Sequence, residues 1–171
     1  MLYKKSHPFI TIFTILIFFG ITILDSAKSF DISIKTATPF LLLPMLLAFA
    51  VFNSTTKSAV LGLILGACAD SVASGSYCFN TIILLVIGTA ACLCANNLFN
   101  KNIRATIVLS FVFSVIYYFA QWVIFHAIGH TSKAALEYLF SFSLPSAIYT
   151  SLFIIPFYFI FRHFDKVRQS I

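Results

Sequence analysis

Charged residues are scarce in this sequence: 9% of its residues are Asp, Glu, Lys or Arg, whereas 60% are hydrophobic and the mean hydropathy is +1.00. A water-soluble domain carries roughly 25% charged residues, so this chain lacks the polar groups needed to cover a surface in water. The 171 residues leave room for one compact helical bundle and no separate soluble domain. The composition therefore predicts an integral membrane protein.

Catalytic motifs are also lacking. The sequence holds no nucleophile–base pair, no glycine-rich phosphate loop and no pair of neighbouring carboxylates, so we expect no enzyme, no catalytic residue and no cofactor. The 11 basic residues stand beside apolar runs and form no stripe with exposed aromatic residues, which argues against nucleic-acid binding.

Metal ligands are sparse as well. His126 and His130 have a spacing that zinc sites use, but Gly129 stands between them and Glu137 is the only further ligand nearby, so we expect no metal site. In or at the edge of apolar runs, cysteine behaves as a small hydrophobic residue, and this is the interpretation for Cys68, Cys78, Cys92 and Cys94.

What the sequence does contain is long apolar runs. Crossing a hydrocarbon core of about 30 Å takes about 20 helical residues. Six runs reach or approach that length: 9–24, 37–52, 58–73, 77–98, 104–128 and 144–161. They predict an all-α bundle of about six transmembrane helices that forms a single domain over residues 1–171. The first run resembles a signal peptide, but no small-residue cleavage site follows it, so we expect it to remain as the first helix.

The basic residues predict the orientation of these helices, because cytoplasmic loops are enriched in Lys and Arg. With the N-terminus in the cytoplasm, three basic residues fall outside, namely Lys28, Lys35 and Lys133. Eight fall inside: Lys4, Lys5, Lys57, Lys101, Arg104, Arg162, Lys166 and Arg168. We therefore expect both termini to be cytoplasmic, which agrees with an even number of helices.

The third run, residues 58–73, combines small residues with an acid. Gly62 and Gly66 form a Gly-xxx-Gly pattern that allows another helix to approach closely. They share one helix face with Ser58, Ala59, Ala69 and Ala73, and Asp70 lies at the edge of that face. We expect this helix to be the most buried in the bundle and this face to contact a helix, either of this chain or of a partner.

Asp70 is the only acid inside an apolar run, and an ionisable group there is a functional hypothesis by default. It could serve as a proton or ligand site, or as a structural acid that hydrogen-bonds a neighbouring helix or caps a break. Counting from the start of the fifth run, Tyr117 and Tyr118 lie at a similar depth and Gln121 about one turn further out. These three are the expected hydrogen-bond donors to Asp70.

Prolines give a further expectation about helix shape. Pro39 opens the second run and Pro145 the last run, where a missing N–H costs no hydrogen bond. Pro44 lies one turn into the second run and Pro156 lies near the inner end of the last run, so kinks are expected at both.

Three stretches resemble the MreD family of bacterial rod-shape-determining membrane proteins. They are the Pro-led TPFLLLPMLLAF, the segment KSAVLGLILGACADSVASGSYCFNTIILLVIG, and the Pro-containing LPSAIYTSLFIIPFYFIFRHFDKVRQ with its basic tail. The middle stretch is the most specific, and Gly62, Gly66, Asp70 and Gly75 are the positions that match. The chain departs from the family pattern at Phe40, where an acid is frequent, and at Tyr149 and Thr150, where Asn is frequent.

This resemblance implies a non-enzymatic, multi-pass protein of the bacterial cell membrane within the complex that directs side-wall peptidoglycan synthesis. The implied partners are the bitopic MreC protein, the actin-like MreB filament and the RodA glycosyltransferase with its transpeptidase. The implied fold is similar to that of the substrate-binding subunits of energy-coupling-factor vitamin transporters.

Such a transporter subunit is also the alternative function. Those subunits have a similar length and six helices, and they usually display an Ala-xxx-Ala face on the first helix. The first run here, FITIFTILIFFGITIL, contains no alanine, which favours the shape-determining role.

Overall fold

The computed structural model describes residues 17–18, 20–22, 39–72, 78–97, 102–127 and 139–169, and in these ranges the chain is helical without a β-strand. The elements are α2 (Leu42–Phe52), α3 (Thr55–Val72), α4 (Phe79–Asn97), α5 (Ile103–Trp122) with the π-helical turn η2 (Val123–Ala127), the π-helical turn η3 (Leu139–Ser143), α7 (Leu144–Leu152) and α8 (Ile154–Gln169). Residues 17–18 and 20–22 are also helical. The remainder of the first predicted helix, 9–24, and Gly75 lie outside the described residues.

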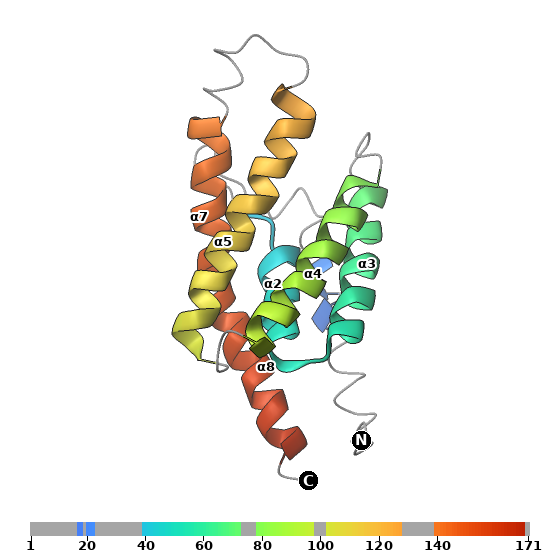
Figure 1. Cartoon of the computed structure of the whole chain (residues 1–171), viewed down its shortest axis with the longest axis vertical. Helices are drawn as coiled ribbons and strands as arrows, with labels where there is room; N and C mark the ends of the chain where they lie inside the picture. The colour runs from blue at the N-terminus through green and yellow to red at the C-terminus, as the bar shows by residue number, and fades with distance from the viewer. Residues whose placement is uncertain are drawn as a thin grey trace.

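Helix α2 lies at the centre of the bundle, with helix pairs on both sides (Figure 1). One pair is the antiparallel hairpin of α3 and α4, and the other is α5 with the α7–α8 segment. Because α2 packs against α4 on one side and α8 on the other, it joins the two pairs. Only a helix that is apolar on all faces can occupy this place, and the sequence LLPMLLAFAVF has no polar residue.

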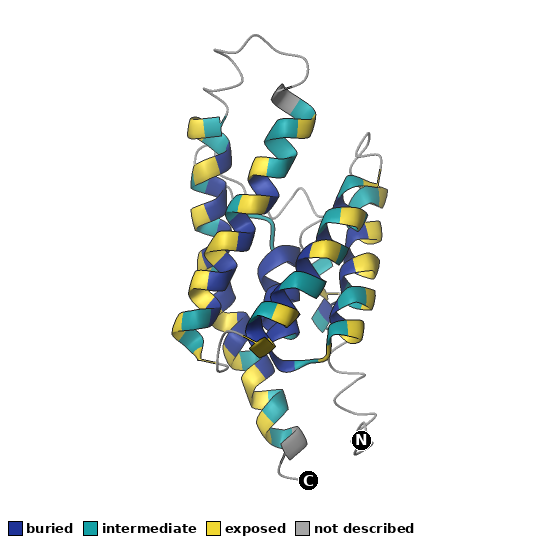
Figure 2. Cartoon of the chain, in the orientation of Figure 1, coloured by how far each residue is buried: buried dark blue, intermediate teal, exposed yellow. Residues whose placement is uncertain are grey.

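The burial pattern corrects one expectation from the sequence. We expected α3 to be the most buried helix, but its buried residues are only Ser58, Gly62, Leu65 and Gly66. Every residue of α2 except Phe49 is buried, as the dark central helix in Figure 2 shows. A face of small residues needs only one close neighbour, whereas a helix with large apolar side chains all round is covered on every side.

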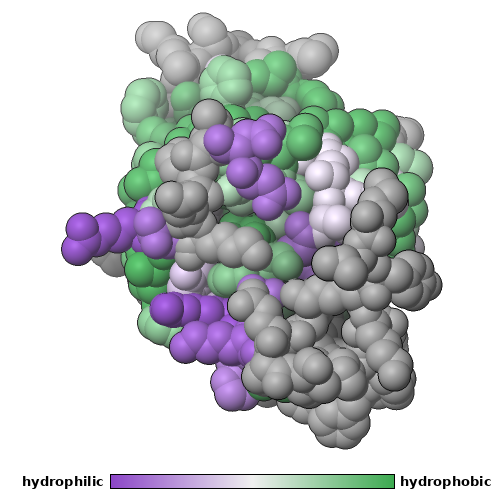
Figure 3. Space-filling view, turned by 60° about the horizontal axis from the view of Figure 1, so that its bottom comes forward, coloured by the Kyte–Doolittle hydropathy of each residue, from purple (hydrophilic) through white to green (hydrophobic). Residues whose placement is uncertain are grey.

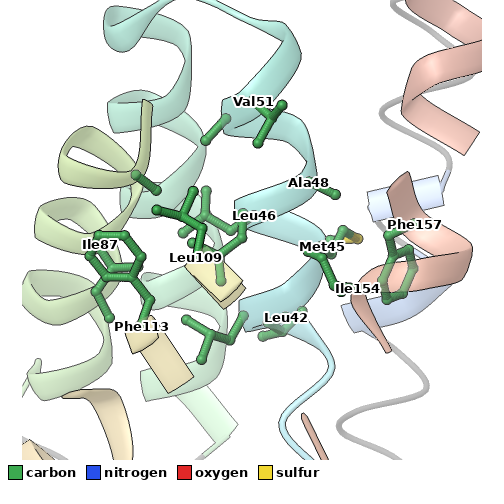
Figure 4. Close-up of a cluster of buried hydrophobic side chains, with 14 of the residues drawn as sticks. Leu42, Met45, Leu46, Ala48, Val51, Ile87, Leu109, Phe113, Ile154 and Phe157 are labelled. Atoms are coloured by element: carbon green, nitrogen blue, oxygen red, sulfur yellow. The ribbon is translucent and has the colours of Figure 1, made fainter. Parts of the chain in front are cut away.

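The core forms where the two helix pairs meet α2. Figure 4 shows side chains of α2, including Leu42, Met45 and Leu46, between Ile87 of α4 and Ile154 of α8. Large apolar side chains that face outward instead are exposed on every peripheral helix, for example Ile82 at 64% and Phe159 at 54%. Surfaces of this kind suit acyl chains and not water.

Among the described residues, three helical segments are suited by length and composition to crossing a bilayer: Phe79–Asn97, Ile103–Phe125 and Leu139–Val167. Helix α2 is apolar but shorter, so the expected number of six crossings stays a prediction. The helices from 37 onward differ from their predicted bounds mostly by a few residues. Because α2 begins at Leu42, Pro44 lies in its first turn, where its missing N–H interrupts no intrahelical bond.

The last predicted helix, 144–161, is interrupted and longer than expected. It divides into α7 and α8 at Phe153, whose N–H bonds to the Thr150 carbonyl at 3.2 Å. Pro156 has no N–H for the Leu152 carbonyl, so the break falls just before this proline. Helix α8 continues past Phe161 to Gln169, because the Lys, Arg and Gln residues there are good helix formers that water can solvate.

Candidate functional site

The α3–α4 hairpin is packed so closely that glycine is required along its contact. A Cβ atom on Gly62 would lie 2.5 Å from the Leu84 carbonyl oxygen, and one on Gly66 would lie 2.6 Å from the Asn80 carbonyl oxygen. Gly88 contributes from the other helix, since its Cβ would lie 2.9 Å from the Ser58 carbonyl oxygen. Ordinary carbon contacts are about 3.5–4.0 Å. The small face of α3 is therefore occupied by α4 of the same chain.

Asp70 lies one helical turn beyond Gly66 and binds the beginning of α4. Its Oδ1 accepts hydrogen bonds from the Asn80 backbone N–H at 3.1 Å and from Asn80 Nδ2 at 3.0 Å. Its Oδ2 accepts bonds from the Thr81 backbone N–H at 2.8 Å and from Thr81 Oγ1 at 2.6 Å. Half-buried Asp70 thus has two donors on each carboxylate oxygen.

The start of a helix is a natural place for a carboxylate. The first four N–H groups of a helix have no partner within the helix, and the helix dipole favours negative charge at that end. In most helices a side chain just before the helix caps these groups. Here the residue before α4 is Cys78, with φ at 60°, and Asp70 of the neighbouring helix supplies the acceptors.

The contact extends from Asn80 to α5. The Tyr117 hydroxyl donates to Asn80 Oδ1 at 2.7 Å in a buried hydrogen bond. The Tyr117 ring stacks on Phe40, just before α2, with the centroids 5.0 Å apart and the planes inclined by 5°. We call Asp70, Asn80, Thr81 and Tyr117 the Asp70 network. It connects α3, α4 and α5 at one level of the bundle.

A second set of hydrogen bonds connects α5 with α7 beside this network. The hydroxyls of Tyr118 and Thr150 are 3.1 Å apart, and the Phe40 backbone N–H donates to Thr150 Oγ1 at 3.1 Å. Phe40 and Thr150 are two of the positions at which the sequence departs from the family pattern. Because they contact each other, the two departures from the family pattern lie at the same place in the bundle.

The three expected donors to Asp70 take different places. Tyr117 reaches Asp70 through Asn80, Tyr118 pairs with Thr150, and Gln121 is half-buried in α5. Asn80 and Thr81, which donate directly to Asp70, were not predicted from the sequence. Two polar residues in the first turn of an apolar helix were the available signal, because the free N–H groups of that turn need an acceptor.

The arrangement favours the structural interpretation of Asp70. A carboxylate whose two oxygens each accept two hydrogen bonds is held in one position, and backbone N–H groups cannot be rearranged without unwinding α4. Among the described residues no group of three or more His, Cys, Asp or Glu side chains could hold a metal ion. The side chain of His126 and all of His130 lie outside the described part.

Comparison with known proteins gives the same family as the resemblance seen in the sequence. The family described as rod shape-determining protein MreD matches residues 7–168, which is nearly the whole chain. No curated protein and no solved structure matches it. The matched region contains the complete Asp70 network, the glycine contact and the apolar helices, and the chain therefore belongs to the MreD family of rod shape-determining membrane proteins.

Proposed function

We propose that this chain is a non-enzymatic, multi-pass component of the bacterial cell-elongation complex in the cytoplasmic membrane, where it helps maintain cell shape by scaffolding side-wall peptidoglycan synthesis. Membership of the MreD family carries this proposal. The outward-facing apolar side chains of the peripheral helices and the three segments within the described ranges that are suited to crossing a bilayer support the membrane location.

Basic residues at one end of the bundle indicate how the protein is oriented in the membrane. Lys57 and Arg104 lie in the first turns of α3 and α5, and Arg162 and Lys166 lie in the last turns of α8. These helix ends point to the same side, at the bottom of Figure 1. Since basic residues favour the cytoplasmic side, this end, including the C-terminal part of α8, faces the cytoplasm. The N-terminal lysines lie outside the described residues, and six crossings would place them on the same side.

The Asp70 network would contribute by fixing the positions of helices. The close α3–α4 contact and the hydrogen bond from Tyr117 keep the hairpin in one register relative to α5. A surface that is already ordered loses less conformational entropy when a partner helix binds, so fixed helix positions would favour assembly. The partners would be an MreC-like bitopic protein, the MreB filament and RodA with its transpeptidase.

The experiment is affinity purification of the tagged chain from its native membranes after mild crosslinking, with mass spectrometry of the recovered proteins. We expect MreC, MreB or RodA to be recovered. Recovery of a coupling subunit with paired ATPases would instead identify a vitamin transporter, and repeated recovery of no shape protein would also contradict the proposal.

A variant tests the part assigned to the hairpin. Gly66→Leu should insert into the membrane but recover fewer partners, because its side chain would have to occupy the position of the α4 backbone. Gly20→Leu is the matched control, since a Cβ at Gly20 meets no atom within 4 Å. Undiminished recovery of partners by the Gly66 variant would show that the hairpin contact is not needed for assembly.

A further inference from the structure

Four exposed cations lie at the end of the bundle where α3 and α5 begin and α8 ends: Lys57, Arg104, Arg162 and Lys166. Figure 3 brings this end forward and shows hydrophilic side chains beside apolar surface. Within the described ranges none of the four forms an ion pair. Exposed cations at a membrane surface attract anionic lipid headgroups.

Each helix carries its cation on the same face as exposed apolar side chains. Residues three, four or seven positions apart share a helix face. The exposed neighbours at these spacings are Val60 and Ile64 for Lys57, Val108 and Phe111 for Arg104, and Ile155 and Phe159 for Arg162. In the last turns of α8, Lys166 follows Arg162 by four residues and extends the same face.

This placement suits a lipid molecule. Exposed apolar faces of a membrane helix contact acyl chains, and long Lys and Arg side chains at their ends reach the headgroup level. The Arg162 guanidinium lies 6.0 Å from the centre of the Tyr158 ring, a cation–π distance that keeps it close to the helix. A water-soluble acidic protein would contact the end of the bundle and would not need apolar faces that continue from each cation.

We propose that Lys57, Arg104 and Arg162 form a rim that binds the phosphate groups of anionic phospholipids, with the acyl chains of each lipid against the apolar side chains of the same helix face. The three positions lie on three different helices. This inference requires only that the chain lies in a membrane, and it is independent of the proposed partners.

The test uses the full chain in phosphatidylcholine vesicles with spin-labelled phosphatidylglycerol or spin-labelled phosphatidylcholine as the probe. Electron spin resonance measures the fraction of each label that the protein immobilises. One cation near an anionic headgroup changes the association constant about fivefold. We expect a preference of this size for phosphatidylglycerol at low salt, and a smaller preference at high salt because of screening.

Two triple variants decide the result. Lys57→Gln, Arg104→Gln and Arg162→Gln together should strongly reduce the preference, with Lys166 accounting for what remains, whereas Lys57→Arg, Arg104→Lys and Arg162→Lys together should retain it. All three residues are exposed, and circular dichroism checks that both variants remain folded. The proposal is overturned if the Gln variant keeps the preference or the wild type has none. It is also overturned if inorganic phosphate removes the preference at an ionic strength where chloride does not, since that identifies a free-phosphate site.

Discussion

Replacing Gly66 with alanine tests the close contact and the Asp70 network together. The added Cβ would lie 2.6 Å from the Asn80 carbonyl oxygen and 2.7 Å from the Thr81 backbone nitrogen. Both are backbone atoms, so no side-chain rotation can relieve the clash. The helices must separate by about 1 Å to restore ordinary contact distances. Asn80 and Thr81 also supply the hydrogen bonds to Asp70, so the same separation stretches those bonds.

The expected loss of stability follows from these two effects. Overpacking a close-packed contact costs about 1–3 kcal/mol. Hydrogen bonds between transmembrane helices contribute about 0.6 kcal/mol each on average, so weakening the four bonds to Asp70 adds about 2 kcal/mol. Gly66→Ala should therefore lower the free energy of unfolding by about 3–5 kcal/mol, although alanine is the better helix former.

The measurement is unfolding of the purified protein by sodium dodecyl sulfate in mixed micelles, followed by circular dichroism. Gly20→Ala is the matched control, because its Cβ would meet no atom within 4 Å and its stability should stay equal or rise by up to about 1 kcal/mol. The reasoning is refuted if Gly66→Ala unfolds within about 0.5 kcal/mol of the wild type, since the helices would then separate without cost.

The same unfolding assay checks four further changes. Tyr117→Phe removes the buried 2.7 Å hydrogen bond to α4 and should lower the free energy of unfolding by about 1 kcal/mol. The control Tyr149→Phe, at a half-buried ring, should change this free energy little. Equal losses in the two variants would contradict a stabilising role for the Tyr117 hydroxyl. Asp70→Asn keeps one acceptor oxygen and should cost about 1–3 kcal/mol, and an unchanged value would mean that the carboxylate bonds add no stability. Thr150→Val removes a hydroxyl of α7 that is hydrogen-bonded both to Tyr118 of α5 and to the Phe40 backbone just before α2. The free energy of unfolding should fall by about 1 kcal/mol, and a value equal to that of the wild type would refute this role. Gly88→Ala should cost less than Gly66→Ala, because its nearest contacts begin at 2.9 Å and include a flexible leucine side chain; the reverse order would refute the distance argument.

Much of the local structure could be predicted from the sequence. The apolar runs predicted where the helices from residue 37 onward lie, because a chain in lipid must satisfy its backbone hydrogen bonds within helices. The bounds differ at polar ends, where α3 begins at Thr55 instead of Ser58 and α8 ends at Gln169 instead of Phe161. Polar residues at those ends join a helix as readily as a loop, so the limit of the apolar run is not the limit of the helix.

The residues of the α3–α4 contact and of the Asp70 network were only partly predictable. Gly62, Gly66 and Asp70 were recognisable because small residues and an acid are unusual in an apolar run. Asn80 and Thr81 were not, because their role depends on which helix end lies beside the acid, and this depends on the fold of the hairpin.

The sequence by itself determined that this chain is a helical membrane protein with a small-residue face, an acid at its edge and basic helix ends. Composition and spacing along one helix are local properties, and they need no knowledge of the neighbours. Only the tertiary structure decided that α4 covers that face, that Asp70 caps α4, and that α2 occupies the centre. These are pairings between helices, and several pairings bury similar apolar area, so close backbone contact and hydrogen-bond geometry select among them.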